Sequence, residues 1–198
     1  MKIDLNENLF IGEGRNRKCY YHPIQRDRCV KISSPKGKRS SQREINYYKR
    51  LKKRGISFEM IARYIGPINT NIGDAEVYEL IRDTNGKISQ SLESYLHQHD
   101  PIMNQTIEKL IEEFRQYLKK EKILFSDFGL GNLLIQHKND QYKLIAIDGV
   151  GDNNQIPFLE YISFLATKRN VRKWDTFISE VSKVSPLLGA KIKRFDEI

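Results

Sequence analysis

The sequence predicts an α+β fold in two unequal lobes: a small five-stranded antiparallel sheet with one helix, and a reduced, mainly helical second lobe. Short apolar runs broken by Gly, Asn and Asp fill residues 1–82, as expected for strands and turns. Residues 101–118 instead repeat apolar side chains at helical spacing. The chain has 198 residues, of which 39% are hydrophobic and 30% charged, so a folded core is expected rather than disorder.

The first three strands surround a turn that contains glycine. We predict them at Asn8–Gly12, Lys18–His22 and Arg28–Ile32. Gly12 and Gly14 stand at the tip of the first hairpin, where the absence of Cβ atoms lets backbone amides approach a phosphate. Arg15 and Arg17 follow, and guanidinium groups bind phosphate in a bidentate manner. The same G-x-G is also typical of an ordinary turn.

Lys31 lies between apolar residues on the third strand. Burying its stem is unfavourable unless the ammonium group has a partner. The next element is a predicted helix, Ser41–Arg54, which ends at Gly55. Its Glu44 lies on the apolar stripe that faces the sheet, so we expect an ion pair between Lys31 and Glu44. Two simpler interpretations stay open: a lysine that faces water from an edge strand, and a capping box, Ser41-x-x-Glu44, at the helix N-terminus.

Two further strands and a turn complete the first lobe. The strands are predicted at Arg63–Ile68 and Ala75–Ile81. The turn signal Asn85-Gly86 follows in the polar linker Arg82–Lys87. We therefore assign residues 1–82 to the first lobe, 83–87 to a hinge and 88–198 to the second lobe.

Helices dominate the predicted second lobe. A short helix covers Leu92–His97, and Asp100 and Pro101 then begin a long core helix. The apolar face of this core helix comprises Ile107, Leu110, Ile111, Phe114, Tyr117 and Leu118. Near the end of the chain we predict helices at Pro157–Thr167, Val171–Val181 and Pro186–Arg194.

Three polar residues frame a predicted hairpin in the middle of this lobe. Its strands are Leu133–Ile135 and Leu144–Ile147. Asp127 stands five residues before Asn132, and Asp148 ends the second strand. The protein-kinase fold builds its phosphoryl-transfer site with this spacing. There the first Asp positions and deprotonates the accepting hydroxyl, and the Asn and the second Asp hold Mg²⁺ on the nucleotide phosphates.

The letters Asp127-Phe128-Gly129 also read DFG, the name of the metal-binding motif of kinases. In that role they would need a D-x-x-x-x-N loop about 15–20 residues upstream, where residues 104–117 instead form a predicted helix. We therefore assign Asp127 to the catalytic-loop position and Asp148 to the metal position. The alternative is a surface hairpin whose Asp and Asn side chains bond their own turns.

The same fold gives roles to the candidate residues of the first lobe. Its strand lysine pairs with the α- and β-phosphates of ATP and with a helix glutamate, the positions of Lys31 and Glu44. A hinge in such a fold grips adenine through main-chain groups, for which the candidates are Glu79, Leu80 and Ile81.

Several segments resemble one bacterial family. They are GEGRNRKCYYHP, RCVKI, NYYKRL, VYELI and the D-x-x-x-x-N loop followed by ID. Over about residues 5–170 the chain is similar to the PhoP-regulatory-network YrbL family, and more distantly to lipopolysaccharide-core kinases and aminoglycoside phosphotransferases. The resemblance implies a protein-kinase-like fold and a place in a bacterial stress regulatory network of the PhoP type. It implies no particular reaction.

The expected function is ATP- and Mg²⁺-dependent transfer of a phosphoryl group to a hydroxyl of an unidentified small-molecule or lipid-linked acceptor. The expected base is Asp127, the metal ligands Asn132 and Asp148, the phosphate ligand Lys31 and its orienting residue Glu44. The alternative is a pseudokinase, a nucleotide-binding or structural module without turnover. An arginine in place of the third loop glycine, the missing Phe of the metal motif and the absence of an A-P-E segment favour this alternative.

Charge and cysteine usage limit the expected partners. The formal net charge of +9 favours an anionic partner such as a nucleotide or an anionic membrane surface, and no aromatic–basic nucleic-acid module is visible. The N-terminus lacks the build of a signal peptide, which predicts a cytoplasmic protein whose Cys19 and Cys29 are reduced packing thiols. No apolar run approaches the length of a membrane span, so no transmembrane segment is expected.

Overall fold

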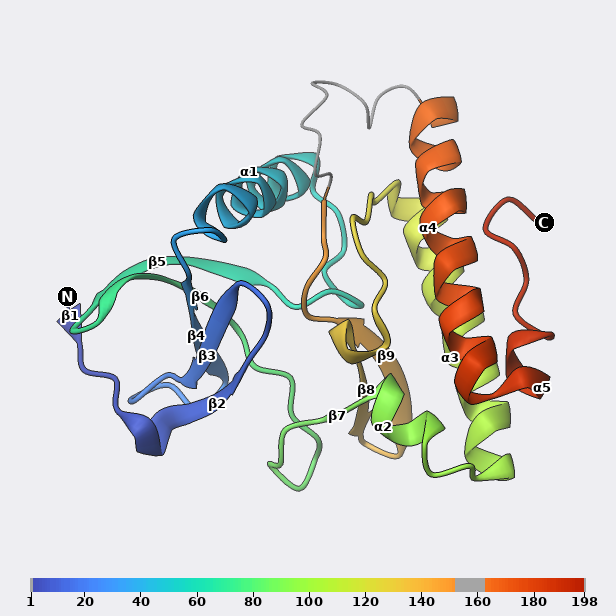
Figure 1. Ribbon diagram of the computed structural model, residues 1–198, viewed down its shortest axis with the longest axis horizontal. Helices are drawn as coiled ribbons and strands as arrows, with labels where there is room; N and C mark the ends of the chain where they lie inside the picture. Colours follow the sequence, from blue (N-terminus) through green and yellow to red (C-terminus); the bar gives the residue numbers. More distant parts are fainter. Residues whose placement is uncertain (1, 152–162, 198) are drawn as a thin grey trace.

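The computed structural model describes residues 2–151 and 163–197 and has an α+β architecture (Figure 1). Six strands form the first sheet in the spatial order β1 (Lys2–Ile3), β5 (Tyr64–Thr70), β6 (Gly73–Glu79), β4 (Arg28–Ser33), β3 (Arg17–Tyr21) and β2 (Phe10–Glu13). The α+β class predicted from the sequence is confirmed.

The first sheet differs from the prediction by one strand. β1 pairs with β5 in parallel, so the sheet has six strands and is not wholly antiparallel. A strand of two residues is too short for an alternating pattern, which is why the sequence did not reveal it. The side chain of Asn71 holds the chain just after β1, since it accepts from Leu5 N at 2.9 Å and donates to Leu5 O at 3.0 Å.

Helix α1 (Lys38–Arg54) lies across one face of this sheet, above it in Figure 1. It begins three residues before the predicted start, after Gly37, which makes no side-chain capping bond. Ser41 therefore lies inside the helix, and the interpretation of Ser41-x-x-Glu44 as a capping box is wrong. The helix ends at Gly55 as predicted, where a φ of 68° favours glycine.

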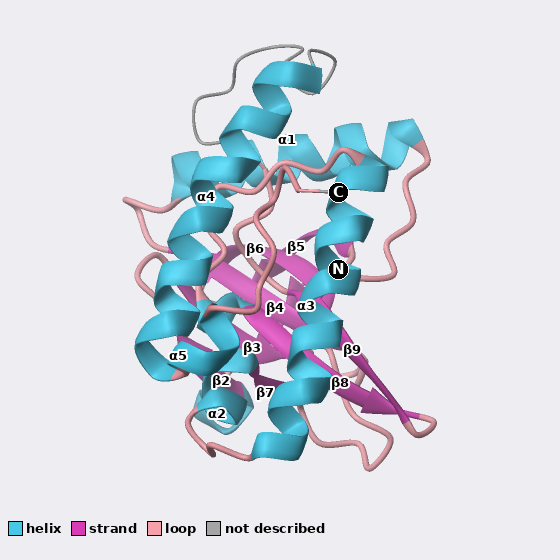
Figure 2. Cartoon of the chain, turned by 90° about the vertical axis from the view of Figure 1, so that its right-hand side faces the viewer, coloured by secondary structure: helices cyan, strands magenta, loops and turns pink. Residues whose placement is uncertain are grey.

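The described residues of the second half form a smaller sheet and four α-helices. The sheet consists of β7 (Gln90–Ser91), β8 (Leu133–Lys138) and β9 (Gln141–Ala146). The helices are α2 (Leu92–Leu96), α3 (Pro101–Glu121), α4 (Ser163–Val184) and α5 (Pro186–Gly189). Figure 2 shows α3 and α4 in front of the strands. As predicted, Asp100 caps α3, accepting from Ile102 N at 2.9 Å.

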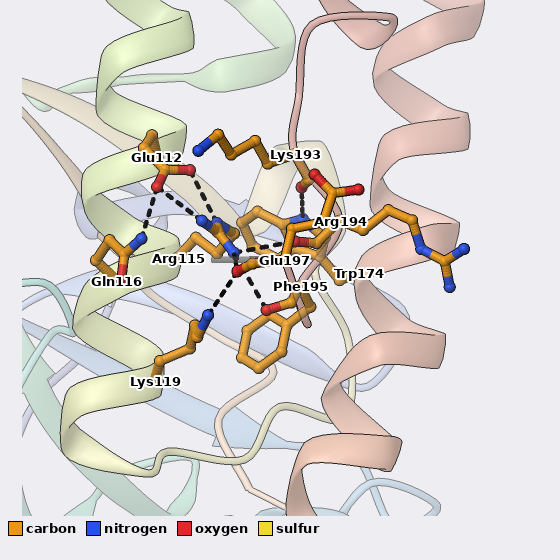
Figure 3. A network of polar contacts seen from close by, with 9 residues as sticks. All are labelled: Glu112, Arg115, Gln116, Lys119, Trp174, Lys193, Arg194, Phe195 and Glu197. Atoms are coloured by element: carbon orange, nitrogen blue, oxygen red, sulfur yellow. Dashed lines mark hydrogen bonds and ion pairs between the residues drawn. The ribbon is translucent and has the colours of Figure 1, made fainter.

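Two predictions for the last helices need correction. Residues 163–184 form one continuous helix where we predicted two, and the first part of the earlier predicted helix, 157–162, lies outside the described residues. Helix α5 ends at Gly189 rather than at Arg194. The chain that follows is held by α3 instead: Arg115, a fully buried residue, donates from Nη1 to the carbonyl oxygens of Arg194, Phe195 and Glu197 (Figure 3).

One hydrophobic core joins the two halves of the molecule. Its buried residues include Tyr47 and Tyr48 of α1 and Tyr78 of β6, together with apolar residues of α3, β8, β9 and α4. The strand β9 also bonds the segment after α1, since Ala62 N donates to Ala146 O at 2.8 Å. No helix in the described part of the chain is long and apolar enough to cross a membrane.

Candidate functional site

A cavity of about 820 Å³ lies among the first sheet, α1 and the loops that flank β8 and β9. Its volume falls within the range of about 300–1,000 Å³ found for small-molecule sites. All the candidate residues predicted from the sequence line it: Gly12, Gly14, Arg15, Arg17, Lys31, Glu44, Glu79, Leu80, Ile81, Asp127, Asn132 and Asp148. The fold thus gathers them from widely separated segments.

The loop between β2 and β3 forms one wall of the cavity. Gly14 N donates to Arg17 O at 2.9 Å, which folds the tip of the loop back. A Cβ atom at Gly12 or Gly14 would meet no atom within 4 Å, so internal packing does not require glycine there. At Gly37, by contrast, a Cβ would lie 2.6 Å from Asn16 O, because the loop rests on the chain just before α1. Glycine at positions 12 and 14 therefore leaves room for a ligand to approach the backbone.

Arg17, at the start of β3, bridges two carboxylates in the cavity. Its Nη2 donates to Glu44 Oε2 at 2.5 Å and also to Asp148 Oδ1. The side chain is only 14% exposed. Burial alone would lower the pKa of the guanidinium, but the carboxylates of Glu44 and Asp148 outweigh burial and raise this pKa above its ordinary value. Arg17, predicted as a phosphate ligand, is thus held here by acidic groups.

Lys31 does not make the predicted ion pair with Glu44. Its Nζ donates to Ile147 O at 2.7 Å and lies 4.8 Å from the ring centroid of Tyr78. Glu44 accepts from the guanidinium of Arg17 instead, through the same Nη2 atom that bonds Asp148. Lys31 remains buried at the cavity wall, with its charge satisfied by a carbonyl and an aromatic face.

The pKa values of the two carboxylates that Arg17 bridges, Glu44 and Asp148, shift in opposite directions. Burial raises the pKa of Glu44, and the guanidinium of Arg17 offsets only part of that effect. Burial would also raise the pKa of Asp148, but Lys31 and Arg17 outweigh it, and this pKa lies below its ordinary value. Asp148 is therefore ionised at neutral pH, as a metal ligand must be, and Glu44 is the carboxylate that takes a proton more readily.

Asp127 is exposed at the cavity and is oriented by its own loop. Its Oδ1 accepts from Gly129 N at 3.0 Å, and its Oδ2 accepts from Asn132 Nδ2 at 3.3 Å. Ile147 N donates to Asn132 O at 2.9 Å, which ties this loop to the end of β9. Asp127 and Asn132, the two members of the D-x-x-x-x-N spacing, are therefore in direct contact.

Phe128 anchors the same loop in the core. It is 3% exposed, and its ring centroid lies 4.7 Å from that of Phe125 and 5.4 Å from that of Trp174. Its neighbour Asp127 lies on the D-x-x-x-x-N loop, while Asp148 is the carboxylate that ends the β8–β9 hairpin. Phe128, the middle residue of the DFG letters, thus holds this loop in an aromatic cluster of the core.

A close approach of two chain segments explains why glycine follows Asp148. Gly149 has a φ of 77°, and a Cβ atom there would lie 2.2 Å from Asp127 O. Ser126 N donates to Gly149 O at 2.8 Å across the same contact. Only glycine fits this position, and the contact places Asp148 next to the loop of Asp127.

The predicted adenine-binding edge is partly occupied by internal hydrogen bonds. Leu80 N donates to Asp27 O at 2.9 Å, and Ser89 N donates to Ile81 O at 3.1 Å. The Glu79 carbonyl accepts a weak bond from Cys29 Sγ at 3.9 Å. In the described chain, the carbonyls of Glu79 and Leu80 and the Ile81 N–H are therefore the main-chain groups here that can still serve a ligand, whereas the Leu80 N–H and the Ile81 carbonyl are engaged.

Sequence reasoning left several lining residues unassigned: Ile11, Cys19, Cys29, Ser40, Ser41, Arg43, Ser126, Leu134 and Ile147. Ser40 was missed because the predicted helix began one residue after it, at Ser41. The two cysteines were expected to pack in the core, and their alternating positions on paired strands are the signal that could have placed them on the cavity side.

The two thiols interact with each other and with Lys31. A hydrogen bond from the Cys19 thiol and the charge of Lys31 outweigh burial and lower the pKa of Cys29 to about 7, while the pKa of Cys19 is raised because that bond and burial retain its proton. We therefore expect a thiolate absorbance in the ultraviolet that titrates near neutral pH and disappears in Cys29→Ser.

The depressed pKa of Cys29 also determines how the stability of the folded protein changes with pH. The folded state binds fewer protons than the unfolded state between about 7 and the ordinary value of 9, so stability should rise with pH in that window. A thiolate titration centred at 9, with flat stability between these values, would contradict the expected interaction.

The residues present suit a magnesium ion held on phosphates. Asp148 and Asn132 offer the oxygen ligands that Mg²⁺ prefers in proteins. The Oε1 atom of Glu44 is buried and has no partner among the described residues. No three His, Cys, Asp or Glu side chains within those residues form a metal-binding group. Mg²⁺ usually takes only one or two carboxylates from the protein and completes its shell with water and substrate phosphates.

Comparison with known proteins identifies the family. The model of the PhoP regulatory network protein YrbL matches residues 3–182. The chain is 30% identical to the uncharacterized protein YrbL of Escherichia coli (strain K12), over 90% of this chain and 87% of that protein. It shows the same identity and coverage with the uncharacterized protein YrbL of Shigella flexneri. The chain therefore belongs to the family of the PhoP regulatory network protein YrbL.

Proposed function

We propose that this protein has a protein-kinase-like fold and transfers a phosphoryl group from ATP, with Mg²⁺, to a hydroxyl of a small-molecule or lipid-linked acceptor. The observation that supports this most is the convergence on one cavity of Lys31 and Glu44 from the first half with Asp127, Asn132 and Asp148 from the second. A surface hairpin with Asp and Asn in its turns would not require these two halves to meet.

Each residue has a defined task in this proposal. Lys31 donates to the nucleotide phosphates, and Asp127 takes the proton of the acceptor hydroxyl on a carboxylate oxygen that its loop already orients. Asn132 and Asp148 hold the metal, which neutralises charge on the phosphates when it is bound. The glycines of the β2–β3 loop let the phosphates approach its backbone closely, although the Gly14 N–H itself is bonded to Arg17 O.

ATP with Mg²⁺ should raise the melting temperature of the protein. A ligand that binds only the folded state stabilises it by about 2.7 kcal/mol at a hundredfold excess over Kd. For a domain of this size that corresponds to a shift of about 5–10 °C in differential scanning fluorimetry. Lys31→Met should reduce the shift, whereas Lys87→Met, at an exposed linker position, should not. The absence of any shift at millimolar ATP and Mg²⁺ would count against the nucleotide site.

A nucleotide-binding or structural module without turnover is the second candidate. The observation that favours it is the bridge from Arg17 to Glu44 and Asp148, which engages two groups that phosphoryl transfer would use. If the module binds nucleotide, ATP would still stabilise the fold, but replacement of Asp127 would change no rate. The two candidates are therefore separated by turnover rather than by binding.

A further inference from the structure

The guanidinium of Arg17 sits where the proposed function requires a metal. It bonds Asp148 Oδ1, an oxygen of the carboxylate assigned to Mg²⁺. The same Oδ1 also accepts from Gly149 N at 2.7 Å, so the backbone fixes the orientation of the carboxylate independently of Arg17. The guanidinium of Arg17 is thus a cation of the protein itself, held against the carboxylate that is assigned to the metal.

The bridge leaves polar atoms beside it unsatisfied. Arg17 Nη1 and Glu44 Oε1 are both buried and have no hydrogen-bond partner among the described residues. Glu44 is only 8% exposed, and both residues line the cavity. Buried polar atoms without partners are unfavourable. A ligand that brings a cation to Glu44 Oε1 or an acceptor to Arg17 Nη1 would therefore stabilise this site.

We propose that Arg17 acts as a resident cation that competes with the divalent metal for Asp148 and thereby sets the metal affinity of the site. The inference rests on the proposed function in taking Asp148 as the metal carboxylate. Asp148 Oδ1 already accepts two hydrogen bonds, from Gly149 N and from Arg17 Nη2, so a metal that coordinates this atom must displace the guanidinium. The released side chain remains at the cavity wall, where its fork can bind a phosphate in a bidentate manner.

The size of the effect follows from simple competition. When only a fraction of molecules is competent to bind, the apparent Kd equals the intrinsic Kd divided by that fraction. If Arg17 holds Asp148 in about nine molecules of ten, its removal should tighten metal binding about tenfold. Arg17→Lys should lie between wild type and Arg17→Gln, because an ammonium keeps the charge but lacks the fork.

Binding of Mn²⁺ to the nucleotide-free protein tests this directly. Mn²⁺ prefers the same oxygen ligands as Mg²⁺, and electron paramagnetic resonance counts the free ion. Arg17→Gln should bind Mn²⁺ about tenfold more tightly than wild type. The matched control is Lys18→Gln, which removes the same charge from the neighbouring position, where the side chain is 58% exposed. The double variant Arg17→Gln/Asp148→Asn should lose the gain.

Equal Mn²⁺ affinities for wild type, Arg17→Gln and Lys18→Gln would overturn the proposal, as would a gain that persists without the Asp148 carboxylate. If Arg17→Gln does not fold, Arg17→Gln/Glu44→Gln removes both charges of the buried pair and serves the same comparison. No nucleotide enters the assay, so its outcome is independent of ATP binding. Absence of an ATP effect on the melting temperature would therefore remove the proposed function and leave the cation site standing.

Discussion

Asp127→Asn is expected to slow phosphoryl transfer by about 10²–10⁴-fold, the usual contribution of a positioned general base, and to leave nucleotide affinity nearly unchanged. The amide keeps the size of the side chain and one acceptor oxygen for Gly129 N, so the loop should retain its shape. It cannot take the acceptor proton. Release of labelled γ-phosphate and self-phosphorylation measure the rate without a known acceptor.

Two matched variants define what that result means. Asp148→Asn should weaken the Mg²⁺-dependent binding of nucleotide itself, because it removes the metal carboxylate. Asp140→Asn, in the exposed β8–β9 turn with a φ of 57°, should change neither binding nor rate, since Asn suits this backbone conformation. If wild type and Asp127→Asn bind ATP alike and label acceptors in cell extract equally, the module without turnover is the better description.

Arg115→Met is expected to lower the free energy of unfolding by about 3 kcal/mol, because it removes three hydrogen bonds to carbonyl oxygens and leaves the buried carbonyl of Phe195 without this donor; an unsatisfied buried group costs about 1–3 kcal/mol. Arg115 is fully buried, bonds three carbonyl oxygens of residues 194–197, and is clamped at Nε and Nη2 by both oxygens of Glu112 at 2.8 Å (Figure 3). Methionine fills much of the same volume, so the measured loss reports hydrogen bonding more than a cavity.

Chemical denaturation followed by the fluorescence of Trp174 suits this test. Trp174 is the single tryptophan of the chain, and its Nε1 donates to Lys193 O at 2.9 Å, beside the segment that Arg115 holds. Lys119→Met removes a more exposed bond, from Nζ to Glu197 O at 2.8 Å, and should cost less than about 1 kcal/mol. Equal losses for the two variants would show that Arg115 does not hold this segment.

Local patterns predicted the regular parts of the fold well. Helix α3 follows the apolar spacing and the cap at Asp100, and helix α1 ends at Gly55, because these signals depend on residues within one or two turns. The hairpin after Asn132 was also predicted, although β8 and β9 extend further, to a turn at Asn139 and Asp140. The short strand β1 was not predicted. It has only two residues, and the segment after it is held by Asn71, which lies far along the chain.

The sequence by itself determined which residue types could carry chemistry and in which order they occur, because glycines, a strand lysine, a helix glutamate and the D-x-x-x-x-N spacing are properties of local segments. Only the tertiary structure decided how these groups pair. Glu44 bonds Arg17, 27 positions away, and Arg17 bonds Asp148, 131 positions away, while Lys31 turns to the carbonyl of Ile147. The choice depends on reach and burial at the point where the two halves meet, and no local pattern encodes those distances.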